Sequence, residues 1–242
     1  MSHLTHPQRP FVLPRVASLL GRTLSRLIDA LAFYLAQPVK HYRPSTAADM
    51  QALSAMLRHG DVLLTEGNSR MATVVRRLTR SSWSHVSMYV GPLEEGPDPR
   101  CIVEADVAAG VRAVPFSAFE GQRVRVLRPT ALDDTDRRRL VDWVVRRIGA
   151  EYDRAHAWAL ARRLLGLPLA SRLLKAPSTM AQGATRFICS SLVAQAFVLV
   201  GYQIAPIQLG VRDAWAADYR YVTPSDFESA SGFEVVRATK IG

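Results

Sequence analysis

Apolar residues follow a helical repeat near the start of the chain and form short runs further along. Between Pro14 and Ala36 they recur every three or four residues, which predicts one amphipathic helix. From Gly60 onward, short apolar runs bounded by turn residues predict about five strands: Asp61–Thr65, His85–Val90, Cys101–Asp106, Val111–Phe116 and Arg123–Leu127. The pattern therefore predicts a sheet-forming core preceded by a helix.

Helical patterns return after these strands. Asp133 or Asp134 is placed to cap a helix that Gly149 would end, and Cys189–Val200 reads as an apolar helix. Phe233–Arg237 is a predicted last strand. Because helices and strands are partly segregated and no dinucleotide-type glycine loop is present, the pattern favours an α+β class over a doubly wound parallel sheet.

Two basic segments are predicted to lie outside this core. Residues 1–48, with six basic side chains and one acidic one, form an N-terminal appendage ahead of a main domain at 49–242. Its helix either docks on that domain or lies on an anionic membrane. Arg154–Arg186, with six basic side chains and no acidic one, reads as a helical insertion. It is either a lid or membrane-docking ridge, or a packed helical pair with its arginines outside.

The charge balance favours an anionic partner. The chain has 31 basic and 21 acidic residues, a net charge of +10, which suits lipid headgroups, nucleic acid or acidic substrates. Nucleic acid is not expected, because no recognition helix, stacking platform or zinc-knuckle spacing is present. No run reaches the ~18 uninterrupted apolar residues of a membrane-spanning helix. Cys101 and Cys189 make no disulfide framework. We expect a cytoplasmic protein, with peripheral contact to the inner membrane as an option.

Cys189 is a candidate nucleophile because of where it lies. It follows an extended stretch and opens a predicted helix. Unpaired N–H groups and the positive end of the helix dipole at that point stabilise a thiolate. The alternative is that Cys189 is a small buried hydrophobe, as free cysteines usually are.

A polar face on the second predicted strand supplies a candidate base. Alternation places His85, Ser87 and Tyr89 on one side of the strand. The following strand has acids at alternate positions, so a hairpin-like pairing sets Glu104 or Asp106 against His85. A buried carboxylate needs such a partner, although a solvated acidic face is the simpler explanation.

Six short motifs in a fixed order resemble one known family. They are Gly60–Leu64, Thr79–Val86, Val103–Ala105, Gly149–Asp153, Phe187–Val193 and Thr223–Phe227. The chain resembles, over about residues 58–240, the circularly permuted papain-like enzymes of the YiiX/YaeF type, within the NlpC-type superfamily. The resemblance implies a permuted papain-like α+β fold, with an antiparallel sheet of about five or six strands packed on helices. The histidine precedes the cysteine, the reverse of the order in papain.

The resemblance also implies roles for individual residues. Cys189 would be the nucleophile, His85 the base and Glu104 the group that orients the imidazole. Tyr152 would line the site and help to hold an oxyanion, and Ser84 and Ser190 would contact substrate. One departure is that Ser191 stands where these proteins commonly have glutamate.

These residues predict a cysteine-dependent hydrolase or acyltransferase that works through an acyl-thioester on Cys189. Its substrate would be an amide or ester whose acyl part is lipid or peptide. No cofactor is expected, and a metal site made from Cys101, Cys189 and His85 is disfavoured because no pair has ligand spacing. The alternative is a catalytically silent, basic, membrane-associated binding or scaffold protein on the same fold.

Overall fold

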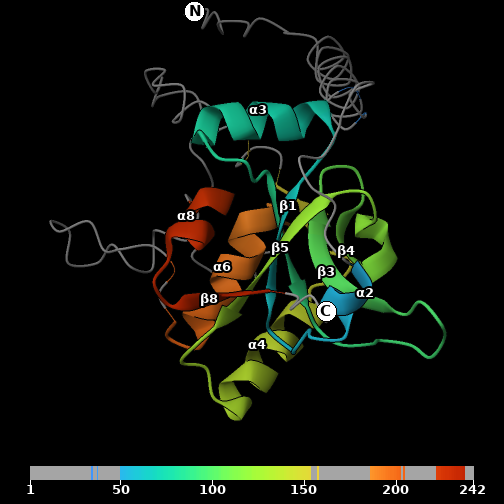
Figure 1. Ribbon diagram of the computed structural model, residues 1–242, viewed down its shortest axis with the longest axis vertical. Helices are drawn as coiled ribbons and strands as arrows, with labels where there is room; N and C mark the ends of the chain where they lie inside the picture. The colour runs from blue at the N-terminus through green and yellow to red at the C-terminus, as the bar shows by residue number, and fades with distance from the viewer. Residues whose placement is uncertain are drawn as a thin grey trace, which may run out of the picture.

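A six-stranded antiparallel sheet organises the molecule (Figure 1). The computed structural model describes residues 50–153, 186–202 and 222–237, together with positions 34, 37, 157 and 204. The strand order is β4-β3-β2-β1-β5-β8. The strands are β1 (Val62–Glu66), β2 (His85–Tyr89), β3 (Arg100–Asp106), β4 (Gly110–Pro115), β5 (Arg123–Pro129) and β8 (Phe233–Val236). The predicted α+β class with five or six antiparallel strands is confirmed.

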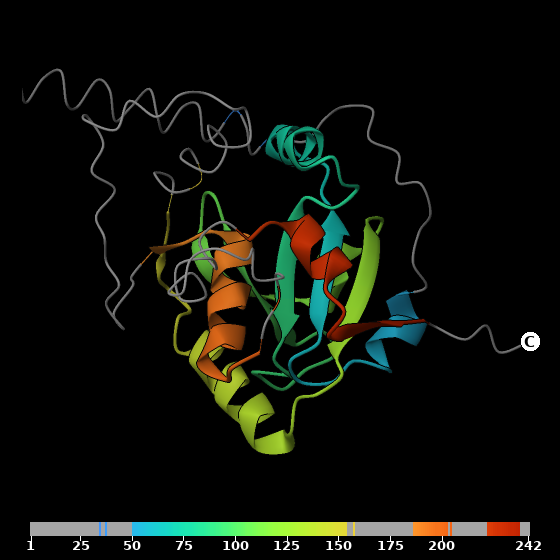
Figure 2. The same ribbon diagram turned by 90° about the vertical axis from the view of Figure 1, so that its left-hand side faces the viewer.

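Both faces of the sheet are apolar. Successive side chains on a strand point to opposite sides, and neighbouring apolar residues of the strands belong to two different core clusters. Leu64 and Met88 belong to the larger core cluster, which also includes residues of α4 (Asp134–Val145) and α6 (Cys189–Leu199). Figure 2 shows these two helices together on one side of the sheet. Because α6 is apolar on most sides, it is buried between the sheet and α4.

The other face of the sheet has a smaller core. Leu63 and Ile102 pack there with residues of α2 (Met50–Ser54) and the 3₁₀ turn η1 (Phe116–Phe119). The helix α2 lies on the side opposite α6 (Figure 2). Neighbouring residues of β1 therefore serve different cores, as the alternation of a strand requires.

A short parallel pair of strands connects two distant parts of the chain. Tyr152 of β6 (Glu151–Tyr152) pairs with Phe187 of β7 (Arg186–Phe187). The strand β7 runs almost directly into α6. This pairing brings Tyr152 beside the first residues of α6.

Two helices were not predicted from the sequence pattern. One is α3 (Arg70–Thr79), capped by the Ser69 side chain, which accepts from the Ala72 N–H at 3.0 Å. The other is α8 (Pro224–Ser229), capped where the Thr223 N–H donates to the Asp226 carboxylate at 2.7 Å. In both, a side chain bonds a backbone N–H at the start of the helix and marks where it begins.

The predicted appendage at 1–48 and the predicted insertion at 154–186 fall almost entirely outside the described residues, and the domain boundaries stay predictions. Among the described residues, no helix has the length and apolar character needed to cross a bilayer.

Candidate active site

Cys189 is the first residue of α6, and Ser191 fixes the start of that helix. The Ile188 N–H donates to the Ser191 hydroxyl at 3.0 Å, and this hydroxyl lies 3.2 Å from the Ile188 carbonyl oxygen. A side chain at the third helical position that accepts from the cap N–H is one half of a capping box, a role usually filled by glutamate or glutamine. Ser191 therefore accepts the hydrogen bond from the cap N–H that a glutamate at this position would accept.

His85 is the first residue of β2, and at this end of the strand β2 no longer pairs with β3. The pairing of β2 with β3 ends at Ser87 and Glu104, so Val86 lies beyond the last pair. Its N–H and that of Ser190 lie near enough to the Cys189 sulfur to lower the pKa of the thiol. The sulfur therefore lies where β2 and β3 diverge, within hydrogen-bonding reach of the His85 ring.

The pKa values of these two side chains move toward an ion pair. Burial alone would raise the pKa of Cys189, but the charge and hydrogen bond of His85 and the two backbone N–H groups lower it overall. Burial would lower the pKa of His85, yet Cys189 and then Glu104 raise it well above its ordinary value. The surroundings thus favour a thiolate beside an imidazolium.

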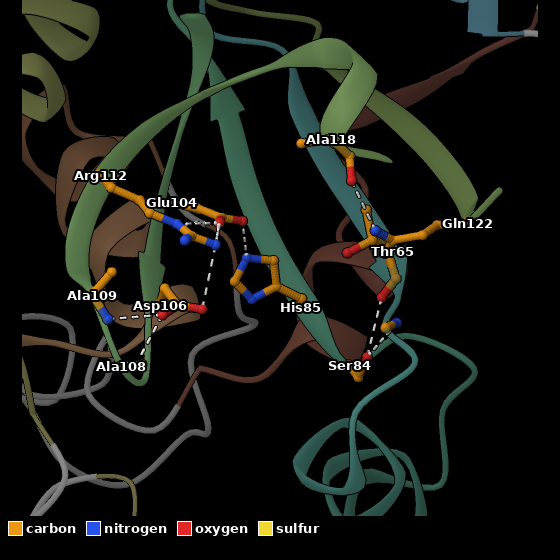
Figure 3. Close-up of polar contacts among 11 residues, drawn as sticks. Thr65, Ser84, His85, Glu104, Asp106, Ala108, Ala109, Arg112, Ala118 and Gln122 are labelled. Atoms are coloured by element: carbon orange, nitrogen blue, oxygen red, sulfur yellow. Dashed lines mark hydrogen bonds and ion pairs between the residues drawn. The ribbon is translucent and has the colours of Figure 1, made fainter. Parts of the chain in front are cut away.

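Glu104 holds the far side of the imidazole (Figure 3). Its Oε2 lies 2.8 Å from His85 Nε2, which leaves Nδ1 for the sulfur. The Glu104 side chain is 8% exposed. Burial opposes its charge, but His85 and Arg112 lower its pKa to about 2. Glu104 is therefore ionised and accepts the Nε2 proton.

Arg112 is a site residue that the sequence analysis missed. Its Nε and Nη2 donate to Glu104 Oε1 at 3.0 and 2.8 Å. The register places Arg112 of β4 directly opposite Glu104 of β3. Continuing the predicted hairpin from its turn at 107–109 would have indicated this pair. The guanidinium occupies one carboxylate oxygen and leaves the other for His85.

The choice between Glu104 and Asp106 that the sequence left open is settled by geometry. Asp106 Oδ1 accepts from the N–H groups of Ala108 and Ala109 at 2.9 and 2.8 Å, within the β3–β4 turn. Its Oδ2 lies 3.4 Å from Arg112. Asp106 therefore stabilises the turn, and Glu104 contacts His85.

Tyr152 lies in the electrostatic field of the thiolate. Burial, and then the charge of Cys189, raise the pKa of Tyr152 well above its usual value. The phenol thus keeps its proton and remains a hydrogen-bond donor near the sulfur. This placement is consistent with the predicted role in lining the site.

The two serines predicted to contact substrate have different surroundings. Ser84 is buried, and its hydroxyl accepts from the Gly67 N–H at 2.9 Å and lies 3.3 Å from the Thr65 carbonyl oxygen. That hydroxyl is engaged inside the fold, so the structure gives no support for substrate contact. Ser190 is also buried, and its backbone N–H, rather than its hydroxyl, lowers the pKa of Cys189.

Cys101 has the opposite surroundings to Cys189. It is buried in the smaller core, and burial raises its pKa. No group of three or more His, Cys, Asp or Glu side chains within the described ranges is placed to hold a metal ion. The side chains that meet at the candidate site are a thiol, an imidazole and a carboxylate.

Residues 56–164 match the permuted papain-like amidases, the YaeF/YiiX or C92 family. The resemblance predicted from the six motifs is confirmed. The matched range contains His85, Glu104, Arg112 and Tyr152 and ends before Cys189. It supports a cysteine-dependent hydrolase in general.

The structural comparison agrees with this family. The solved structure of the metalloprotein YiiX from Escherichia coli O157:H7 superposes with a TM-score of 0.50 at 18% identity, over 75% of this chain and 97% of that one. At this identity the likeness shows the fold, which is permuted papain-like. The search of curated proteins finds no match.

Proposed function

We propose that this protein is an amidase that cleaves its substrate through an acyl-thioester on Cys189. The observation that carries the proposal is the continuous chain of contacts from the sulfur through His85 to Glu104 and Arg112. An ordinary buried cysteine needs no imidazolium beside it. A nucleophilic cysteine does, because the thiolate is the attacking form.

The first half of the reaction forms the thioester. The Cys189 thiolate attacks the amide carbonyl carbon, forming a C–S bond and moving the carbonyl electrons to oxygen. Tyr152, which keeps its proton, and backbone N–H groups at the start of α6 are the donors suited to that oxyanion. As the C–N bond breaks, the His85 imidazolium gives its proton to the leaving amine.

The second half regenerates the thiolate. Neutral His85 takes a proton from water, the hydroxide attacks the thioester carbon, and the C–S bond breaks to release the acid. The balance is amide plus water to acid plus amine. Glu104 stabilises the imidazolium that is present before acylation and that forms again when His85 takes the proton from water. Resolution by an amine instead of water would make the same site an acyltransferase.

Intact-protein mass spectrometry with activated acyl donors tests this proposal. A series of p-nitrophenyl esters and p-nitroanilides should leave an acyl adduct on Cys189 and release the chromophore. Cys189→Ala should form no adduct, and His85→Ala should slow acylation by roughly 10²- to 10⁴-fold at neutral pH. Cys101→Ala is the matched control and should behave as wild type.

Two outcomes would overturn the proposal. If Cys189→Ala releases the chromophore as fast as wild type, the nucleophile is another group. If no donor acylates the wild-type protein, the catalytically silent binding protein becomes the better account of the same fold.

A further inference from the structure

The helix α3 attaches to the body through its small and polar side. Ala72 is buried, and a Cβ added at Gly67 would lie 3.1 Å from the Ala72 Cβ. Arg76 Nη1 donates to the Gly67 carbonyl at 2.6 Å and lies 4.0 Å from a Glu66 carboxylate oxygen. This side of α3 therefore faces the end of β1.

The apolar side of α3 points elsewhere. Met71, Val74, Val75 and Leu78 have the i, i+3, i+4, i+7 spacing of one helix face. This face lies roughly 130° around the helix from Ala72 and Arg76. None of the four belongs to or packs on either core cluster, and Val74 is 41% exposed. The apolar face of α3 thus has no partner in the cores of the described part of the chain.

The charge of α3 is entirely positive. The helix and its cap contain Arg70, Arg76, Arg77 and Arg80 and no acidic residue, and Arg77 and Arg80 are exposed. A short helix with an apolar face flanked by arginines has the composition of helices that lie in the interface of an anionic membrane. Both views place α3 beyond one end of the sheet, away from α4 (Figures 1 and 2).

We propose that the apolar face of α3 docks on an anionic lipid surface. The helix lies between β1 and β2 in the chain, and His85 opens β2. Docking would therefore hold the His85 end of the sheet next to the bilayer. The proposal rests on the shape and charge of α3 and not on the thiol chemistry, so either can fail without the other.

The alternative partner for the apolar face of α3 is the N-terminal segment of this chain, residues 1–48. The Arg70 N–H donates to the Gln37 carbonyl at 3.1 Å, and the Arg70 guanidinium lies 4.1 Å from the Tyr34 ring centroid. Tyr34 and Gln37 therefore lie beside the start of α3. The sequence of residues 1–48 contains six basic side chains and one acidic one. Since α3 is basic as well, charge complementarity favours an anionic surface over this segment.

Vesicle co-sedimentation of the full chain tests the docking. We expect binding to vesicles of equal parts phosphatidylglycerol and phosphatidylcholine, little binding to phosphatidylcholine alone, and weaker binding as salt screens the charges. Val74→Asp and Arg77→Glu should each weaken binding roughly tenfold or more, since each removes a contact that an interfacial helix uses.

Matched controls make the same chemical changes elsewhere. Val235→Asp alters a valine of β8 that is 43% exposed, and Arg138→Glu alters an exposed arginine of α4. Both should bind vesicles as wild type does, and all four variants should keep the wild-type melting temperature.

Three results would overturn the docking. One is a wild-type protein that does not bind the anionic vesicles. A second is a weakening that is equal in the α3 variants and their controls. The third is a Val74→Asp protein with unchanged vesicle binding and a lowered melting temperature, which would assign the face to the chain's own N-terminal segment.

Discussion

Cys101 and Cys189 are identical side chains whose pKa values move in opposite directions. Burial raises that of Cys101, whereas His85 and backbone N–H groups lower that of Cys189 in spite of burial. Position at a helix start accounts for part of this difference. The larger part comes from His85, which lies far away in sequence.

The carboxylate of Glu104 should make the fold sensitive to acid. Its pKa falls from 4.5 to about 2, chiefly through His85 and Arg112 acting against burial. A lowered pKa stabilises the fold above pH 4.5, and that contribution is lost as the pH falls toward 2. The shift corresponds to about 3 kcal/mol. Urea unfolding at pH 5, 4, 3 and 2 should show wild type losing about that much more stability than Glu104→Gln.

Glu94 provides the control for this measurement. Its pKa also falls to about 2, through Arg100, but this pair is exposed to solvent. Screening makes such a pair worth little, so Glu94→Gln should follow the wild-type acid curve. If the free energy of unfolding falls equally with pH in wild type and in Glu104→Gln, then His85 and Arg112 do not lower the pKa of Glu104.

The sequence indicated His85, Glu104 and Cys189 but not Arg112. Alternation within a strand shows which residues share a face, and it indicated His85 but left Glu104 and Asp106 open. The family resemblance implied Glu104. Arg112 required the register between two strands, which depends on the turn that joins them. The family resemblance implied that Ser84 contacts substrate, yet its hydroxyl bonds backbone groups inside the fold.

At the scale of elements, the β3–β4 hairpin holds Glu104 and Arg112 opposite each other. Gly110 closes its turn with a φ of +74°, and a Cβ there would lie 2.4 Å from the Ala150 carbonyl oxygen. The Val111 N–H donates to that oxygen at 2.8 Å. The turn thus also positions the backbone just before Tyr152.

Gly110→Ala should destabilise the protein by more than about 2 kcal/mol, because it adds a backbone clash to a left-handed conformation. Gly121→Ala is the matched control. Gly121 has a φ of +71° but open space around its Cβ position, so only about 1 kcal/mol of backbone strain is expected. Thermal unfolding of the two variants measures the difference. Equal losses would mean that the Ala150 backbone moves aside freely.

Most strands could be predicted, and their ends differ from the predicted ones by one or two residues. The helix α3 was missed because it is short and its neighbours in the chain form strands. Ser69 and the spacing from Met71 to Leu78 were the available signals. The helix that Gly149 was expected to end stops at Val145, and Ile148 beyond this end is 39% exposed.

At the scale of the whole molecule, the site unites segments that are far apart in the chain. Tyr152 arrives through the β6–β7 pair, His85 through the central strand β2, and Cys189 through the helix packed on that strand. Periodicity cannot show such pairings, because it describes one segment at a time. The family resemblance implied that these residues share one site, and the order of the strands in the sheet gives the physical reason.

The most direct test of the thiolate–imidazolium pair is the pH dependence of alkylation. Iodoacetamide should modify Cys189 of the native protein at a nearly constant rate between pH 5.5 and 7.5, while Cys101 reacts slowly and faster as the pH rises. In His85→Ala, the Cys189 rate should fall by at least about tenfold at pH 6 and rise with pH as for an ordinary thiol. A His85→Ala profile identical to that of wild type would contradict the account.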